Sequence, residues 1–367
     1  MPRREDRALI TGAGRFVDDL PIPGALHLAL VRSPHAHARV VAIDLGAALQ
    51  APGAIAIFTA KDLDEIAPMP VNRLFEPMVV PPHPILASDI VRAQGTPVAA
   101  IVADSAYHAA DAAALVAVEY EPLAGVASAA DALAPGAPPV LIEAPGNRAF
   151  AHRWRAGDAT AALTVTHRVV SVSARQQLLA GVPLETRAVA ARWDATTDEL
   201  TLWTSTQVPF RIRAEVARML ALDEGRVRVI APDVGGGFGV KGGPYREEPL
   251  VAWLARRLAR PVKWTATRVE DFVTTHHARG DRDGLTRARP RWHHHGAPCL
   301  DRGAARIEPD LHGGDDPAEP RALLTRRVRD TGRRHRGGRR ADDDASGRLL
   351  PRRRSARGGL LDRAPRR

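Results

Sequence analysis

The segment Gly235–Lys241 reads G-G-G-F-G-V-K, and the rest of the chain is arranged around it. It follows a short β-type run, Val227–Ile230, which Pro232 and Asp233 close, and it precedes an amphipathic run, Tyr245–Leu258. A strand, a glycine loop and a helix in this order let backbone N–H groups approach an anionic or polar ligand, because no Cβ blocks the approach and the helix N-terminus adds partial positive charge. The alternative interpretation is a tight turn without a ligand. The spacing fits neither a dinucleotide fingerprint nor a P-loop.

Length and composition narrow the class of protein. The chain has 367 residues, which is enough for about two domains. Its one cysteine, Cys299, excludes a disulfide framework and a cysteine-ligated iron–sulfur cluster within this chain. No apolar run approaches the ~20 residues of a membrane span, and no apolar stretch follows the charged segment Met1–Arg7 as a signal peptide would require. We therefore expect a soluble cytoplasmic protein.

The formal charge of +10 is unevenly distributed. Residues 281–367 contain 23 Arg, no Lys and 13 acidic residues, so they carry the whole excess. Residues 1–280 hold equal numbers of basic and acidic side chains. This balanced part gives no reason to expect nucleic acid or an acidic partner.

The first third of the chain mixes strand-like runs with one helix. Apolar runs bounded by turn residues predict strands at Leu26–Arg32, Val40–Ile43, Ala54–Phe58, Thr96–Ala103 and Val116–Tyr120. The Ala-rich run Ser105–Val116 predicts a helix with Ser105 as its N-cap. The mixture favours an α+β domain over residues 15–125, after an N-terminal arm, 1–14. Residues 126–157, rich in Ala, Pro and Gly, are expected to form a linker.

A second region extends over residues 158–280. Alternating and apolar runs predict strands and helices at Leu163–Ala174 (strand), Ala188–Trp193 and Glu199–Thr204 (hairpin), Pro209–Leu222 (helix), Pro261–Trp264 (strand) and Arg268–Phe272 (turn or helix). The glycine segment and its flanking strand and helix fall in the middle of this region. It therefore predicts a second α+β unit.

Residues 281–367 differ in character from the rest. They contain no Phe, no Tyr, one Ile and one Val, which is too little apolar surface for a core. We expect a disordered, low-complexity tail. Because a natural basic tail usually mixes Lys with Arg, 23 Arg without a Lys suggest GC-rich DNA read in the wrong frame. A frameshift near codons 280–290 is the hypothesis.

Several ordered motifs, considered together, resemble a known family. They are T-G-A-G-R-F-V-D-D (11–19), V-R-S-P-H-A-H-A-R-V (31–40), P-I-L-A-S-D-I-V-R (84–92), P-L-E-T-R (183–187), S-T-Q-V-P-F-R-I-R (205–213) and P-D-V-G-G-G-F-G-V-K (232–241). Over about residues 3–280 the chain resembles the molybdopterin-binding large subunit of the xanthine dehydrogenase, aldehyde oxidase and aerobic carbon-monoxide dehydrogenase family. The resemblance implies an α/β hammerhead domain followed by the start of a molybdenum-cofactor-binding α+β domain.

The resemblance also implies a chemistry and a set of partners. The family hydroxylates an aldehyde, an N-heterocycle or a similar small molecule at a molybdopterin centre, either Mo-molybdopterin or its cytosine dinucleotide form. Its electrons leave through an iron–sulfur small subunit and an FAD-binding medium subunit. No membrane or nucleic-acid partner is expected.

Five residues match the family's cofactor-binding motifs. Gln207 matches the glutamine that hydrogen-bonds the molybdenum oxo ligand, and an amide suits this role because it donates without adding charge. Gly236, Gly237, Phe238 and Gly239 match the loop beside the metal and the pterin. Two alternatives stay open: Gln207 as a strand-end residue that satisfies local backbone, and Phe238 as a core anchor under the loop.

Glu185, in the P-L-E-T-R motif, is a further candidate, with a buried structural acceptor as the alternative. Lys241 and Arg246 are expected to be solvated rather than functional. The pair His35 and His37 is not expected to bind metal. No residue of this chain is expected to ligate the metal directly.

In the family, several hundred further residues carry most pterin contacts and the general-base glutamate. We find no catalytic residue in this chain, and proton abstraction needs a base, so we expect a fragment that is inactive alone. The codons permitted for residues 351–365, shifted by one nucleotide, can encode the family's R-G-A-G-R-P-E-A segment, which supports the frameshift. The alternatives are a hammerhead scaffold and a protein whose Arg-rich tail binds nucleic acid.

Overall fold

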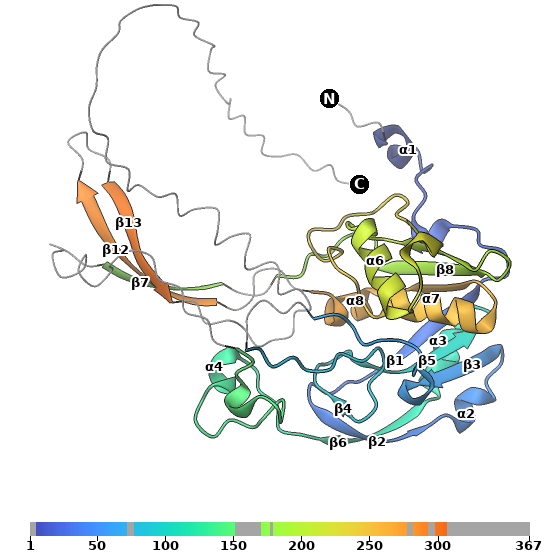
Figure 1. The fold of residues 1–367 in the computed structure, drawn as a ribbon, viewed down its shortest axis with the longest axis horizontal. Coiled ribbons are helices and arrows are strands. Elements are labelled where there is room, and N and C mark those ends of the chain that lie inside the picture. Colours follow the sequence, from blue (N-terminus) through green and yellow to red (C-terminus); the bar gives the residue numbers. More distant parts are fainter. Residues whose placement is uncertain are drawn as a thin grey trace, which may run out of the picture. The chain divides into compact units, whose positions relative to one another are not determined.

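The computed structural model describes residues 5–71, 77–150, 170–176, 179–276, 282–292 and 298–306 (Figure 1). Helices, 3₁₀ turns and β-strands all occur within these ranges. The mixture agrees with the α+β class that the sequence predicts. The arm residues 1–4 and most of the tail, including residues 307–367, lie outside the described residues.

The main feature of the fold is a seven-stranded sheet with the order β10-β9-β8-β11-β1-β5-β3. Its strands are β1 (Leu26–Arg32), β3 (Ala54–Thr59), β5 (Pro97–Ala103), β8 (Ala188–Asp194), β9 (Glu199–Thr204), β10 (Val227–Ile230) and β11 (Val262–Thr265). Three of them come from the first α+β region of the sequence and four from the second. One sheet therefore runs through both regions.

The two regions join where β1 pairs with β11. The pairing is parallel, with Leu26 opposite Val262, and the Leu26 N–H donates to the Pro261 carbonyl at 2.8 Å. The sequence patterns predict both strands but not this pairing. The hairpin expected from residues 188–204 is present as the antiparallel pair β8 and β9.

Both faces of the sheet are covered, as strand β5 shows. All seven of its residues are buried. Ala100 and Val102 pack into the main core, whereas Ala99 and Ile101 pack with Ala112 of helix α3 (Ala106–Ala114). Successive side chains on a strand point to opposite faces, so a strand between two packed layers reads as a continuous apolar run.

Helices α6 (Pro209–Met219) and α7 (Glu247–Leu258) pack with strands of the second region (Figure 1). Each is slightly shorter than its apolar pattern predicts. Ser105 caps α3 by accepting from the His108 N–H, as expected from its position. Helix α8 (Arg268–Thr274) begins with a capping box of Thr267 and Glu270.

Two three-stranded sheets accompany the main one. Their strands are β4 (Ile90–Val91), β2 (Ala38–Asp44) and β6 (Ala117–Pro122) in one, and β13 (Pro298–Arg306), β12 (Arg282–Trp292) and β7 (Val170–Gln176) in the other. The remaining short elements are helices α1 (Asp6–Ile10), α2 (Gly46–Leu49) and α4 (Ala129–Ala132), and the 3₁₀ turns Val17–Asp19, Ala60–Asp62, Pro145–Asn147 and Glu224–Arg226.

The structure has helical or strand elements in two stretches that the sequence predicts as linker and tail. Residues 126–150 of the expected linker contain α4, and the buried Asn147 side chain donates to the Ala132 and Pro138 carbonyls and accepts from the Val140 N–H. In the expected tail, the backbone of 282–292 and 298–306 forms β12 and β13. The frameshift and the disorder of the rest of the tail stay predictions. No helix within the described residues has the length and apolar character needed to cross a membrane.

Candidate functional site

The glycine loop, residues Gly235–Lys241, is tied at both ends to one carboxylate. The Gly235 N–H and the Lys241 ammonium both donate to Glu185 Oε2, each at 2.8 Å. Glu185 lies in the segment before β8, fifty residues upstream of the loop. Its other oxygen, Oε1, is buried and has no hydrogen-bond partner among the described residues.

The glycines of the loop are needed mainly for contacts with the chain itself. A Cβ on Gly235 would lie 2.4 Å from the Glu185 Cβ, and a Cβ on Gly237 would lie 2.3 Å from the Gln207 Cδ. The space at these two positions is therefore filled by the protein's own side chains. Gly236 and Gly239 have φ angles of +101° and +88°, which favour glycine.

Gln207 lies directly against this loop, after the end of β9. Its backbone N–H donates to the Lys241 carbonyl at 2.9 Å, and its side-chain Oε1 accepts from the Lys241 N–H at 3.2 Å. The side chain is nevertheless exposed. No hydrogen bond from the Gln207 Nε2 occurs within the described part of the chain, so this donor is available at the surface of the loop.

The expectation for Lys241 and the alternative left open for Phe238 are wrong. Lys241 is not solvated: it is only 1% exposed, because its ammonium is paired with Glu185 inside the fold. Phe238 is not a core anchor, since it is 68% exposed and has a φ of 52°. Its ring lies beside Gly236 instead, on the open side of the loop.

The N-terminus of α7 is satisfied by the chain's own carboxylates. Glu247 and Glu248 occupy its first turn, and Glu248 Oε2 accepts from the Tyr245 N–H at 2.9 Å. Negative charge is stabilising at this end of a helix. The partial positive charge at the N-terminus of α7 is thus balanced by Glu247 and Glu248 and not by a ligand. The glycine loop is then the part of this motif that a ligand could contact.

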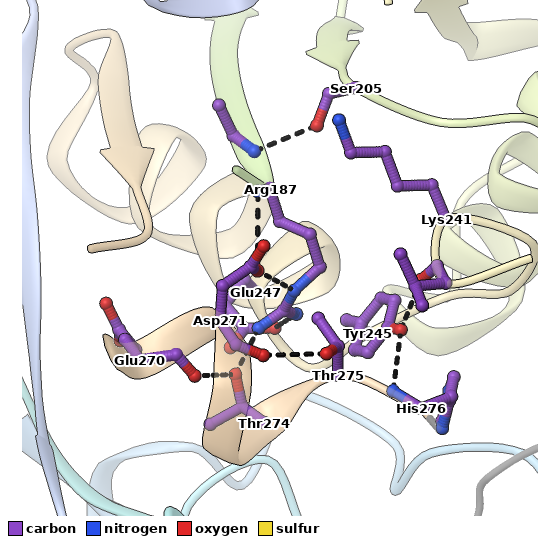
Figure 2. Close-up of polar contacts among 12 residues, drawn as sticks. Arg187, Ser205, Lys241, Tyr245, Glu247, Glu270, Asp271, Thr274, Thr275 and His276 are labelled. Carbon is purple, nitrogen blue, oxygen red and sulfur yellow. Dashed lines mark hydrogen bonds and ion pairs between the residues drawn. The ribbon is translucent and has the colours of Figure 1, made fainter. Parts of the chain in front are cut away.

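A buried charge cluster is centred on Arg187 and is shown in Figure 2. The Arg187 guanidinium donates to Glu247 Oε2 at 3.0 Å and to Asp271 Oδ1 at 3.1 Å, and also to the Thr274 hydroxyl. Its central carbon lies 4.0 Å from the centroid of the Tyr245 ring. Arg187 therefore connects the start of β8 to α7 and α8.

A second arginine extends the cluster to the first region of the chain. Arg32, on β1, donates to Glu247 Oε1 at 2.7 Å and to Glu270 Oε1 at 2.6 Å. Glu247 thus accepts from an arginine on each of its oxygens. Burial alone would raise the pKa of Glu247, but Arg187 and Arg32 lower it to about 2.

The pKa of the neighbouring Glu248 is shifted in the opposite direction. Burial, and then the negative charge of Glu247, raise the pKa of Glu248 to about 7. Its Oε1 accepts from the Thr204 hydroxyl at 3.3 Å. A cavity of about 10 Å³, close to the room that one water needs, lies among residues that include Arg187, Glu248 and Lys241.

The structure brings together all the site residues that the sequence suggests: Gln207 and Glu185 both contact the segment that contains Gly236, Gly237, Phe238 and Gly239. Their contacts with a cofactor stay predictions. Within the described residues there is no cluster of three or more side chains suited to a metal ion. The triplet His293–His295 lies outside the described residues.

Sequence reasoning missed Arg187 and Tyr245, and it misjudged Lys241. A signal was present for Arg187, which ends the P-L-E-T-R motif directly before the apolar run A-V-A-A. A charged residue at the edge of a buried strand needs partners, and the adjacent acids Glu247 and Glu248, directly before the apolar run Pro249–Ala255, are the complementary signal. Nothing in the local pattern indicates that Lys241 is buried.

Family models match both regions of the chain. Residues 11–124 match the aldehyde oxidase and xanthine dehydrogenase a/b hammerhead domain. Residues 141–282 match the molybdopterin cofactor-binding domain, which contains the loop, Glu185 and Gln207.

Individual relatives give the same result. The nicotine 6-hydroxylase large subunit of Paenarthrobacter nicotinovorans is 37% identical over 279 residues, which cover 76% of this chain and 34% of that relative. The carbon monoxide dehydrogenase large chain of Hydrogenophaga pseudoflava is 36% identical, covering 75% and 36%. The structure of quinoline 2-oxidoreductase from Pseudomonas putida 86 superimposes with a TM-score of 0.73 at 36% identity, covering 79% and 37%. The chain spans about a third of the length of these proteins.

A hammerhead domain followed by a molybdopterin cofactor-binding domain defines a molybdopterin-binding large subunit. This chain belongs to the xanthine dehydrogenase family of such subunits. The site also fits such a cofactor chemically. Among the described residues, the Gln207 Nε2 donor and the buried Glu185 Oε1 have no partner, and no atom lies within 4 Å of the position of a Cβ at Gly239.

Proposed function

We propose that this chain forms one wall of the molybdenum-cofactor site in the large subunit of a molybdenum hydroxylase. The observation that carries the proposal is the position of Gln207, whose exposed amide rests against Gly237 and whose Nε2 has no acceptor in the part of the chain that the structure describes. This amide would donate to an acceptor atom of the bound cofactor, and the backbone of Gly236–Gly239 would border it. When bound, the cofactor supplies oxidative hydroxylation.

The names of two relatives support a proposal for the substrate class. Nicotine and quinoline, named in two of them, are N-heterocycles, and we propose an N-heterocycle, an aldehyde or a similar small electron-poor molecule as substrate. The exposed Phe238 ring on the open side of the loop is suited to contact a flat apolar surface.

We also propose that the chain works with other subunits. One relative is named as a subunit of the 6-hydroxypseudooxynicotine dehydrogenase complex. With one cysteine in 367 residues, this chain has no set of thiolates for an iron–sulfur cluster. An iron–sulfur subunit and an FAD-binding subunit would then carry the electrons away.

A polypeptide of these 367 residues is proposed to be inactive alone. The described residues supply the amide and the loop, and the two carboxylates beside them, Glu185 and Glu248, accept from backbone N–H groups of the chain itself. Purified from a host that makes the cofactor, the polypeptide should contain well below one molybdenum per chain. Elemental analysis that gives close to one molybdenum in monodisperse protein would contradict this.

A chimera tests the proposed function directly. Residues 11–282 would replace the matching segment of quinoline 2-oxidoreductase, and the molybdenum content of the purified chimera would be measured. We expect close to one molybdenum per chimera, at least a tenfold loss of hydroxylation rate for Gln207→Ala, and no change for Gln50→Ala, an exposed glutamine at the end of α2. A folded chimera without molybdenum, or Gln207→Ala with full activity, refutes the proposal.

The frame hypothesis has a separate test. If residues 281–367 come from a shifted reading frame, the nucleotide sequence of the gene should encode the family's glutamate-bearing segment in another frame. A gene in which no frame encodes that segment would leave the Arg-rich tail as a genuine part of the protein.

A further inference from the structure

The buried Lys241 is the least expected feature of the site. A lysine ammonium is rarely buried unless it is paired, and this one is 1% exposed. Its partner is Glu185, at 2.8 Å, whose side chain is 12% exposed. An ammonium held inside the fold in this way does not reach a ligand on the open side of the loop, so its role must be exerted through other groups.

The Lys241–Glu185 pair closes the glycine loop. Glu185 Oε2 accepts from the N–H of the first loop residue, Gly235, and from the side chain of the last, Lys241. A loop with several glycines has high conformational entropy in the absence of such ties. One carboxylate oxygen therefore holds both ends of the loop against the segment before β8.

The backbone of Lys241 in turn fixes Gln207. The Gln207 N–H donates to the Lys241 carbonyl, and the Lys241 N–H faces the side-chain amide of Gln207. Because a backbone N–H can only donate, the amide atom that it faces must be the oxygen. The orientation of the amide follows: its oxygen is held by the loop, and its NH₂ group is left to donate outward.

We propose that Lys241 is a positioning residue, which, through its buried ion pair with Glu185, holds the loop so that Gln207 presents a hydrogen-bond donor to the cofactor. Without the tie, the Lys241 N–H moves away from the Gln207 amide, and the amide is free to rotate and present its oxygen. The proposed function enters only in the identity of the group that accepts the hydrogen bond from the Gln207 Nε2. The positioning itself is a property of this chain.

The test uses the full 367-residue chain labelled with ¹⁵N-glutamine. The chain has five glutamines, so the backbone and side-chain amide signals of Gln207 can be assigned by their loss in Gln207→Ala. For Lys241→Met we expect the Gln207 backbone N–H to exchange with solvent at least tenfold faster. The two protons of its side-chain amide should also move toward the shifts of a free glutamine.

Two further variants separate positioning from stability. Glu185→Leu combined with Lys241→Met removes both charges, so it should recover much of the thermal stability lost in Lys241→Met while the Gln207 signals stay altered. Lys263→Met is the matched control, because Lys263 is also buried and is paired with Asp18 at 3.1 Å. It should lower stability without shifting the Gln207 signals.

The outcomes distinguish the inference from the proposed function. Unchanged Gln207 exchange in a folded Lys241→Met or double variant overturns the positioning role, whatever the chain binds. If Lys241→Met does not fold, the double variant decides. Loss of molybdenum chemistry in the chimera on Gln207→Ala, but not on Lys241→Met, also overturns positioning and leaves the proposed function intact.

Discussion

Two buried cations lie close together in this molecule, and their surroundings differ. Arg187 has carboxylate partners on both α7 and α8, a hydroxyl partner and the face of Tyr245. Within the described ranges, Lys241 is paired with one carboxylate, Glu185, whose Oε1 has no hydrogen-bond partner there. The planar guanidinium suits several partners at once, whereas the ammonium acts as a point charge.

The difference indicates what each region does. The Arg187 cluster uses its hydrogen-bonding capacity within the fold, so it serves to hold β8, α7 and α8 together. The glycine loop leaves Glu185 Oε1 and Gln207 Nε2 unused within the described residues. Buried polar groups are normally satisfied, so the buried Glu185 Oε1 is an exception within the described residues, whereas the Gln207 Nε2 is exposed and open to a ligand.

The largest expected effect is the loss of the Arg187 guanidinium. Arg187→Met leaves Glu247 and Asp271 buried with less compensation, and breaking a buried pair in this way costs about 3–5 kcal/mol. Urea denaturation would measure the fall in the free energy of unfolding.

The matched control is Arg213→Met, which removes a pair between Arg213 and Glu224, side chains that are 40% and 47% exposed. A surface pair of this kind contributes about 0–1 kcal/mol. If the two variants lose equal stability, the Arg187 cluster is not the structural centre that we infer.

The second effect depends on pH. The pKa of Glu248 is raised from 4.5 to about 7 in the fold, so between these values the folded state binds a proton that the unfolded state does not. Stability from this group is complete below the unfolded pKa and is lost as the pH rises through about 7. The full loss should be on the order of 3 kcal/mol, because the folded pKa lies about 2.5 above the unfolded one.

Glu248→Gln isolates this contribution, because glutamine is uncharged at every pH. The free energy of unfolding, measured by urea titration at intervals from pH 5 to pH 8, should fall more steeply in the wild type than in the variant. Parallel pH profiles would show that Glu248 titrates normally in the fold.

The third effect compares two glycines of the loop. Gly235→Ala places a Cβ 2.4 Å from the Glu185 Cβ and close to its backbone, and overpacking of this kind costs about 1–3 kcal/mol. Gly239→Ala meets no atom within 4 Å and incurs only the strain of a positive φ, about 1 kcal/mol. Thermal unfolding of both variants measures the difference.

The opposite order, with Gly239→Ala more destabilised than Gly235→Ala, would mean that the loop is not packed against Glu185. It would then be the tight turn without internal contacts that the sequence alone also allows.

The sequence predicts most of the elements but less of their arrangement. Apolar runs bounded by turn residues locate β1, β5 and β8 closely, because burial and chain reversal are local in sequence. The parallel pairing of β1 with β11 is not visible in either strand, since it depends on contacts between segments far apart in the chain.

The site shows the same limit. Because the motifs resemble those of a known family, they predict that Gln207, Glu185 and the loop belong to one cofactor site. The burial of Lys241 depends on the position of Glu185, 56 residues away, and no local pattern reports it. Likewise, Phe238 reads as a core residue by its type, yet its positive φ at the tip of the loop turns it outward.

The pairing of Leu26 with Val262 also has a consequence for synthesis on the ribosome. At roughly 5–20 residues per second, tens of seconds pass between the emergence of β1 and that of its partner β11. During this interval one edge of β1 offers unpaired backbone groups to any passing strand. A nascent chain with this topology is therefore open to edge-to-edge pairing with other chains until residues 262–265 have emerged.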